Sequence, residues 1–286
     1  MNIDNNAWLT LYQKEFNRTS YIYHFTSIEK AILILYGDSL RFSKTTSLND
    51  TLEAKPKISS SKIISNIDFN AIFNFLKKIN DEYIQLLCFS KDSERHLETL
   101  DNIKYFSDYK GRGFALPRMW AQYAHDNDGI CFVFNKEKLS KIIEDTLNNC
   151  LIKNGNVKYI SQFEDLNFNY EKLNFLKNQD IEIINSINIA QFLKEHEEYT
   201  EYNYFYKLDD WSNENEYRFL AFSNEELYIK NIKKAIVGIV IGERIKPSDE
   251  KIIKYFVDDI CEIKKISFTY NGCLLQNIYN EEKYYV

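Results

Sequence analysis

The sequence predicts an α+β protein that forms a single domain over residues 1–286, with a helical insertion at about 165–206. Strand-like segments gather toward both ends of the chain, and helical periodicity dominates between them. With 8 Gly and 3 Pro, the chain is typical of a dense fold rather than a linker-rich one. The pair Asn271-Gly272, between two strand-like segments, is its strongest hairpin signal.

The segment from Tyr21 to Ser27 is expected to be a short strand that leads into a helix. Period-two alternation places His24 and Thr26 on one strand face, and Ser27 can cap a helix that Gly37 closes. A histidine and a threonine beside a helix start can hold a polar ligand. The alternative is a half-buried histidine with a local hydrogen bond.

The other expected elements follow from apolar periodicity and from capping residues. Further strands are expected at 39–43, 83–90, 130–134, 157–160, 214–222, 235–241, 265–270 and 273–279. Helices are expected at 7–18, at 69–76, at 117–124 behind Pro117, after the Asn135 cap and after the Ser248 cap. A long loop is expected over 91–113, and the acidic, tyrosine-rich stretch 197–206 indicates an exposed amphipathic helix face.

The composition argues against several classes of protein. Lys+Arg 36 against Asp+Glu 42 gives a formal net charge of -6, so the total charge does not indicate nucleic-acid binding. The 5 Cys are scattered without a C-x-x-C pair, which favours reduced core residues and no zinc site. The chain opens without a secretory signal, and its apolar runs are too short to cross a bilayer. We expect a cytoplasmic protein without a membrane segment or a metal.

Four polar clusters are candidates for a site. They are His24 with Thr26; Arg41, Ser43, Asn49, Asp50 and Glu53; the segment 120–129 with Trp120; and the segment 207–218 with Glu214, Glu216 and Arg218. On one strand face, Glu214, Glu216 and Arg218 would be costly to bury unless they were paired or bound a ligand. The alternative is an edge strand with solvated charges.

The order of six short motifs resembles a bacterial family. The motifs are Y-H-F-T-S, L-R-F-S, N-D-x-x-E, C-F-S, M-W-x-x-Y-x-x-x-x-x-G and W-x-x-E-x-E-Y-R, and the likeness covers about Tyr21 to Gly242. The chain resembles the domain-of-unknown-function family twenty-nine seventy-one over that range, apart from the central helices at about 169–201.

That family is, more remotely, similar to the ADP-ribosyltransferase fold, in which an H-x-T strand, a middle strand with serine or tyrosine and a late strand with glutamate form the site. The first element is matched by His24 with Thr26 and the second by Ser90. The best match to the third element is Glu216, and Glu214 is the next best. The resemblance implies a split antiparallel or mixed β-sheet core with surrounding and inserted helices. It also implies an enzyme that uses NAD as a substrate to modify a macromolecular target, as a toxin or an anti-phage effector.

The resemblance assigns catalytic roles to His24 and Glu216, because a carboxylate can stabilise the sugar cation formed when the nicotinamide–ribose bond breaks. Tyr36 would stack on nicotinamide, and Arg41 or Arg218 would bind the pyrophosphate. The other expected substrate-binding residues are Thr26, Ser43, Asn49, Asp50, Glu53, Ser90, Trp120 and Glu214. The chain has no Gly-rich dinucleotide fingerprint, so NAD would not act as a hydride carrier, and the reaction needs no metal.

Two other functions remain open at the level of sequence. The same polar residues could form a buried ion-pair network in a non-catalytic module that binds a nucleotide or a partner. Arg118 and His125 have a spacing that resembles metal-independent ribonucleases of the all-helical HEPN type. The acceptor, the oligomeric state and the choice between Glu214 and Glu216 are left open.

Overall fold

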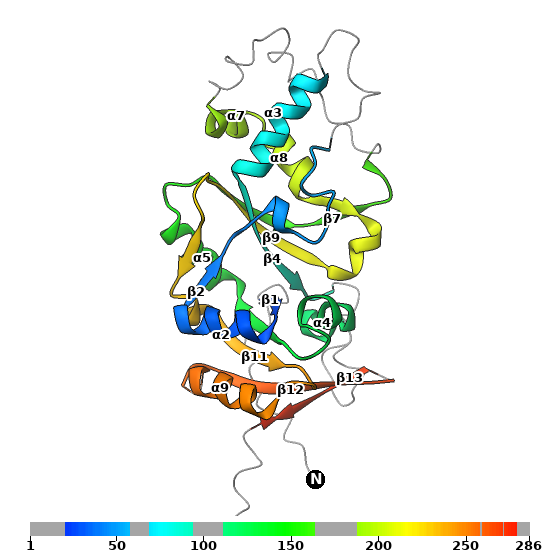
Figure 1. Cartoon of the computed structure of the whole chain (residues 1–286), viewed down its shortest axis with the longest axis vertical. Helices are drawn as coiled ribbons and strands as arrows, with labels where there is room; N and C mark the ends of the chain where they lie inside the picture. The colour runs from blue at the N-terminus through cyan, green and yellow to red at the C-terminus, as the bar shows by residue number, and fades with distance from the viewer. Residues whose placement is uncertain are drawn as a thin grey trace, which may run out of the picture.

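The protein has an α+β fold with a mixed sheet of nine strands among the described residues (Figure 1). The computed structural model describes residues 21–57, 69–93, 111–163, 188–257, 259–270 and 272–278. The strand order is β13-β12-β11-β5-β1-β4-β9-β6, and β3 also pairs with β4. Only the β11–β12 pair in this sheet is parallel. The predicted fold class is therefore confirmed.

The strands of the large sheet occur along the whole described chain. They are β1 (Tyr21–Thr26), β3 (Ser43–Lys44), β4 (Ile84–Lys91), β5 (Ile130–Asn135), β6 (Ile152–Asn156), β9 (Glu216–Phe222), β11 (Ile236–Ile241), β12 (Glu262–Thr269) and β13 (Gly272–Asn277). Two small sheets pair β2 (Ser39–Arg41) with β10 (Tyr228–Lys230), and β7 (Lys158–Ile160) with β8 (Tyr206–Leu208).

Helices cover the sheet and extend from one end of it. They are α2 (Ile28–Gly37), α3 (Phe69–Glu82), α4 (Pro117–Tyr123), α5 (Lys136–Thr146), α7 (Ile189–Glu195), α8 (Glu197–Tyr204) and α9 (Pro247–Val257). Short 3-10 turns are η1 (Thr45–Ser47), η5 (Gly113–Ala115), η8 (Asp209–Glu214) and η9 (Ile232–Ala235). Helices α2 and α9 contact each other, and α3, α7 and α8 lie together at the upper end in Figure 1.

Strand β1 is split from β4 over most of its length. It pairs with β5 from Tyr21 to Thr26, but with β4 only at two positions, Ile22 with Lys91 and Tyr23 with Ser90. Farther back along β4, Leu86 pairs instead with β3. The two strands therefore part after Tyr23, and a gap opens beside the residues that follow it.

The link from β1 into α2 forms as the sequence predicts, with one difference at its end. The Ser27 side chain accepts a hydrogen bond from the Lys30 amide, and Ile28 and Ala31 are buried on the inner face. The left-handed residue that ends the helix is Asp38 (φ 44°) rather than Gly37. The Asp38 carboxylate accepts a hydrogen bond from the Lys233 amide at 2.8 Å, which holds this less common conformation.

Strand β9 lies between β4 and β6, and all seven of its residues are buried. The alternative of a solvated edge strand is therefore wrong. Glu214 lies in η8, before Asn215 takes a left-handed conformation at φ 45°. The alternation predicted that Glu214 would share a strand face with Glu216, and this prediction is wrong because Glu214 precedes the strand.

The tyrosines of α8 also differ from expectation. Tyr199, Tyr202 and Tyr204 are buried in a cluster with Leu76 and Phe192, so the predicted exposed helix face is a packed core instead. The acidic residues between them misled the sequence interpretation, because the tyrosine rings supply the apolar area. The expected N-terminal helix, most of the 91–113 loop, residues 165–187 of the insertion and Asn271 lie outside the described residues.

Candidate functional site

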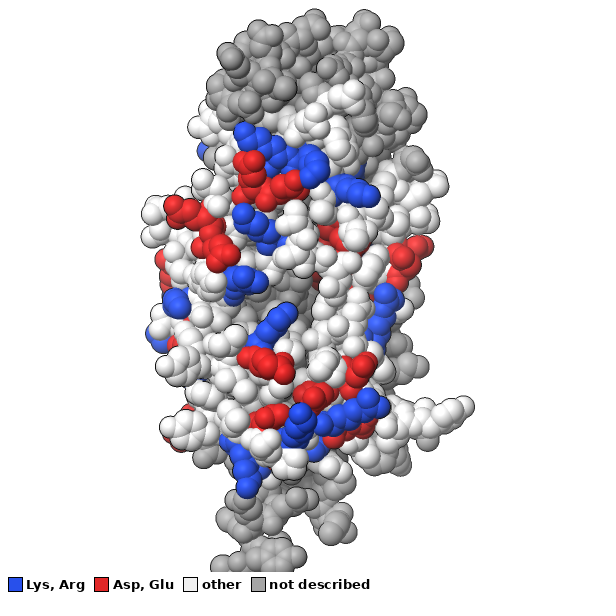
Figure 2. Space-filling view, in the orientation of Figure 1, with Lys and Arg blue, Asp and Glu red and all other residues white. Residues whose placement is uncertain are grey.

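A cavity of about 710 Å³ opens where β1 and β4 part, and Figure 2 shows the corresponding face of the molecule hollowed near its middle. Its walls come from β1, α2, the segment from β2 to Glu53, β4, α4, β8, η8, β9 and β10. Most of the predicted site residues line it: His24, Thr26, Arg41, Ser43, Asn49, Asp50, Glu53, Ser90, Glu214 and Glu216. Four separate stretches of sequence therefore converge on one cavity.

His24 spans the gap between the two strands. Its Nδ1 lies 3.2 Å from the carbonyl oxygen of Cys88 on β4, and its ring lies 5.6 Å from that of Phe89. A carbonyl can only accept, so Nδ1 carries the proton and Nε2 is left as an acceptor. Burial lowers the pKa of His24 below its usual value, although the Cys88 carbonyl opposes that shift. The imidazole is therefore neutral at pH 7.

Glu216 reaches the cavity from the other face of the sheet. Across β4, Glu216 pairs with Ser90, and Ser90 pairs with Tyr23, so these three side chains share a face. His24 follows Tyr23 and points to the opposite face by alternation. Both His24 and Glu216 nevertheless line one cavity, because the parting of the strands opens the sheet at this point.

Glu216 forms a bidentate ion pair with Arg218. Its Oε1 accepts from Arg218 Nε at 2.8 Å and its Oε2 from Arg218 Nη2 at 2.7 Å. Arg218 is fully buried, and it also binds Glu53 and donates to the Tyr204 carbonyl at 2.8 Å. Burial would raise the pKa of Glu216, but the charges of Arg218 and Lys207 outweigh it and lower that pKa to about 2.

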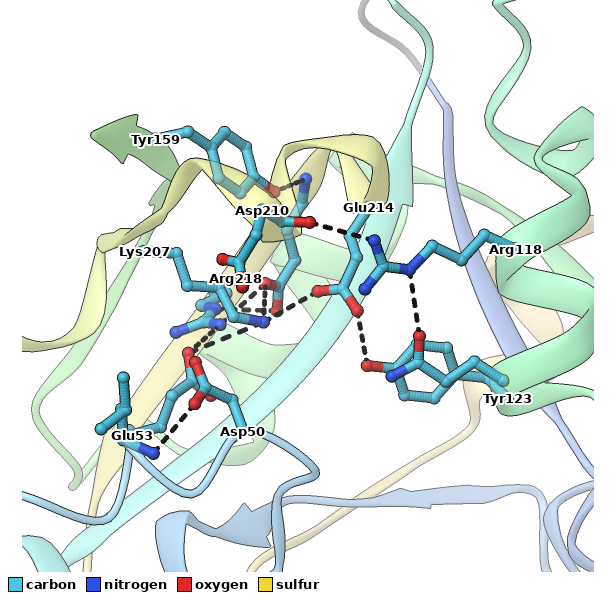
Figure 3. Close-up of polar contacts among 12 residues, drawn as sticks. Asp50, Glu53, Arg118, Tyr123, Tyr159, Lys207, Asp210, Glu214 and Arg218 are labelled. Atoms are coloured by element: carbon cyan, nitrogen blue, oxygen red, sulfur yellow. Dashed lines mark hydrogen bonds and ion pairs between the residues drawn. The ribbon is translucent and has the colours of Figure 1, made fainter. Parts of the chain in front are cut away.

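Lys207 joins the carboxylates into one cluster, drawn in Figure 3. Its Nζ lies 2.8 Å from Glu214 Oε2, 3.4 Å from Glu216 Oε2 and 3.9 Å from Glu53 Oε1. Burial opposes its ionisation, but Glu216 and Glu53 raise the pKa of Lys207 above its usual value. Sequence reasoning missed Lys207. The signal was present, since three buried carboxylates need more cationic charge than Arg218 provides.

Helix α4 supplies the far wall of the cluster (Figure 3). The Tyr123 hydroxyl donates to Glu214 Oε1 at 2.7 Å. Burial and the charge of Glu214 raise the pKa of Tyr123, so it stays a donor at neutral pH. Arg118 donates to the Asp210 carbonyl at 3.0 Å and lies over the Trp211 ring at 5.3 Å, which fixes α4 against η8. Tyr123 was not predicted as a site residue.

Charge is distributed unevenly around the cavity. In the cluster, three carboxylates (Glu53, Glu214, Glu216) face two cations (Lys207, Arg218), so 3 minus 2 leaves one net negative charge. Lys30 and Arg41 also line the cavity, and both are exposed. The cavity thus has an anionic end inside and cations at its surface.

Three predicted substrate-binding residues lie elsewhere. Tyr36 is 80% exposed and packs edge-on against Phe256, away from the cavity lining. Trp120 is fully buried, with its Nε1 donating to the Phe114 carbonyl at 2.7 Å, so it is a core residue. Arg218 supports Glu216 from behind and does not line the cavity, so it cannot bind a pyrophosphate there.

The ribonuclease alternative depends on an all-helical fold, which the nine-stranded sheet does not match. Arg118 is bound to η8, and the exposed His125 follows α4 in a left-handed conformation at φ 49°. The five cysteines are free thiols. Within the described ranges, no group of His, Cys, Asp or Glu could hold a metal ion, and no helix is long and apolar enough to cross a membrane.

Comparison with protein families finds a match over the part of the chain that holds the last two of the six motifs. Residues 119–219 match the family described as Protein of unknown function (DUF2971). The predicted resemblance to this family is confirmed over these residues. The matched part of this chain runs from α4 into β9 and contains Tyr123, Lys207, Glu214, Glu216 and Arg218. It therefore includes the ion cluster except for Glu53, and it does not include the His24 strand.

A solved structure shows a distant similarity to this chain, and no curated protein matches. The structure is Thermus sp. 2.9 DarT in complex with NAD+, with 11% sequence identity and a TM-score of 0.32. The match covers 87% of this chain and 97% of that one. A TM-score this low is no basis for transferring a fold or a function.

Proposed function

We propose that the chain is an ADP-ribosyltransferase-like enzyme that uses NAD to modify a macromolecular target in the bacterial cytoplasm. One observation carries the proposal: the H-x-T residues His24 and Thr26 line the same cavity as Glu214 and Glu216. The chain also carries the serine of the middle strand, Ser90, between them. These residues are the ones that the motif resemblance implied, and all of them line one cavity.

The size and charge of the cavity fit a dinucleotide such as NAD. A volume of about 710 Å³ lies within the range of roughly 300–1,000 Å³ typical of ligand pockets. NAD has a cationic nicotinamide ring at one end and an anionic pyrophosphate in its middle. The net negative cluster around Glu216 suits the first, and the exposed cations Lys30 and Arg41 suit the second.

In the proposed reaction, the bond between nicotinamide and ribose breaks and its electron pair leaves with nicotinamide, which departs neutral. Positive charge then develops on the ribose, as in glycoside hydrolysis. Glu216 is ionised at pH 7, because its pKa is about 2, and can stabilise that charge. An acceptor nucleophile bonds to the ribose carbon and releases its proton to solvent.

His24 and Thr26 would hold the ribose. Nδ1 of His24 is occupied by the Cys88 carbonyl, so Nε2 can accept from a ribose hydroxyl. Thr26 comes two residues later on the same face and lines the same cavity. Because the imidazole is neutral, it keeps this acceptor at neutral pH. Glu214 would orient a substrate hydroxyl while Tyr123 and Lys207 fix its carboxylate.

Purified protein incubated with labelled NAD and a bacterial lysate tests the proposal. We expect nicotinamide release and transfer of label to an acceptor by the wild type. His24→Ala and Glu216→Gln should abolish transfer while remaining folded by circular dichroism. If the wild type neither binds nor consumes NAD, the proposal is wrong. Growth arrest on expression, relieved by Glu216→Gln, would support a toxin or anti-phage role.

A second candidate is a non-catalytic module that binds a nucleotide or a partner. The specific observation in its favour is that Arg218 engages both oxygens of Glu216. In this case Glu216→Ala would unfold the protein, whereas the nearly isosteric Glu216→Gln would keep its function. Nicotinamide release that is lost in a folded Glu216→Gln variant would exclude the module.

A further inference from the structure

The small sheet of β2 and β10 places an aromatic ring and a guanidinium side by side at the cavity mouth. Tyr228 pairs directly with Arg41 across the two strands. Directly opposite residues have Cβ atoms roughly 4.5–5.5 Å apart and point to the same face. Both side chains line the cavity, and both are exposed.

The surroundings of Tyr228 leave its ring open to a ligand. Tyr228 is 42% exposed, and Leu33 of α2, which also lines the cavity, is 68% exposed. Both are large, exposed side chains in the cavity lining, which also includes the exposed cations Lys30 and Arg41. The Lys230 ammonium lies over one face of the Tyr228 ring, with Nζ 5.9 Å from the ring centroid, and adds positive charge there. An aromatic face in this setting suits a flat, electron-rich ring attached to an anion.

Glu226 holds both partners loosely. Its Oε1 lies 3.9 Å from Arg41 Nη1, and its Oε2 accepts from the Tyr228 hydroxyl at 3.2 Å. The side chains of Arg41 and Glu226 are 55% and 63% exposed. Exposed ion pairs of this length contribute little stability, so an anion can displace Glu226 from Arg41 at little cost.

We propose that Tyr228 is the platform on which the base of a bound nucleotide stacks, with Arg41 binding the phosphates next to that base. This deepens the proposed function, on which it rests, by giving the substrate a direction. The adenine end lies at the mouth against Tyr228, and the nicotinamide end lies inside against the carboxylate cluster. Charge decides this direction, because the cationic ring favours the net negative end and the pyrophosphate favours Arg41.

Calorimetric titration of the full chain with ADP and with inorganic pyrophosphate tests the platform. We expect Tyr228→Ala to weaken ADP binding about tenfold and Tyr228→Phe to bind nearly as well as wild type, because the ring is kept. Pyrophosphate has no base, so Tyr228→Ala should leave its affinity unchanged, whereas Arg41→Met should weaken both ligands. Tyr255→Ala is the matched control, since Tyr255 is 84% exposed on α9 and does not line the cavity.

Glu226→Gln gives a test in the opposite direction, because it releases Arg41 and should tighten ADP and pyrophosphate alike. Equal ADP affinity in wild type and Tyr228→Ala, with NAD still bound and consumed, would overturn the platform and leave the proposed function standing. ADP binding that depends on Tyr228, without any binding of NAD, would support the platform and contradict the transferase. If the wild type binds no ADP, the platform is refuted.

Discussion

The charge of Glu216 should account for a large part of the stability of the protein at neutral pH. Replacing Glu216 by Gln removes that charge from a residue that is 5% exposed and leaves Arg218 and Lys207 with less compensation. The pKa of Glu216 falls from 4.5 to about 2 in the folded protein, a difference of about 2.5. At roughly 1.36 kcal/mol for each pH unit, this corresponds to about 3 kcal/mol. The total free energy of unfolding of a typical domain is only about 5–15 kcal/mol.

The direction of the pH dependence follows from the lowered pKa. The stabilisation is fully present above pH 4.5, the pKa of the unfolded chain, and is lost as the pH falls toward about 2. Wild type should therefore lose about 3 kcal/mol across that window. Glu216→Gln should start about 3 kcal/mol lower at pH 7 and change little there, so that the two curves converge in acid.

Urea unfolding followed by circular dichroism between pH 7 and pH 2.5 measures both curves. Glu226→Gln is the matched control, because that carboxylate is 63% exposed and its loss should change stability by less than about 0.5 kcal/mol. The reasoning is refuted if Glu216→Gln unfolds within 0.5 kcal/mol of wild type at pH 7, or if the two pH profiles run parallel.

Three further outcomes are expected. Lys207→Met should lower the free energy of unfolding by about 3–5 kcal/mol in thermal unfolding, because Glu214 loses its buried cation. A decrease of less than about 1 kcal/mol would contradict this expectation. The imidazole of His24 should titrate below pH 6.5 when followed by NMR. The contribution of His24 to NAD binding should therefore stay constant above pH 6.5 and weaken as the imidazole becomes protonated. A titration midpoint at or above 6.5 would contradict the neutral assignment. Trp120→Phe should cost about 1–3 kcal/mol, because the Phe114 carbonyl loses its buried donor, yet leave ADP affinity unchanged; a large loss of affinity would return Trp120 to the site.

Local signals predicted much of the fold. The Ser27 cap, Pro117 at the start of α4, the Asn135 cap and the apolar strand Ile236–Ile241 each depend on residues close in sequence, and each forms as expected. The predictions that failed concerned features that depend on packing between segments far apart in the sequence. The sequence of α8 alone suggests an exposed amphipathic helix, and the burial of its tyrosines follows from their cluster with residues of α3, α7, β4 and β9.

The site was predictable where residue type decided the outcome. His24, Glu53 and Glu216 were predicted as site residues from polar clusters and from motif positions, and all three line the cavity. Tyr36 and Trp120 were misplaced because an aromatic ring suits a core, a surface or a ligand equally well. The proposed platform at Tyr228 could not be predicted from the sequence, since it depends on the pairing of β10 with β2.

The most direct test of the proposed function is release of nicotinamide from NAD by wild type and by Glu216→Gln, measured at pH 7 on samples shown to be folded. We predict that the wild type releases nicotinamide, and that Glu216→Gln binds ADP but releases none, because the base platform is intact while the charge on the catalytic carboxylate is gone. Equal release by the two proteins, or none by the wild type, would contradict a transferase centred on Glu216.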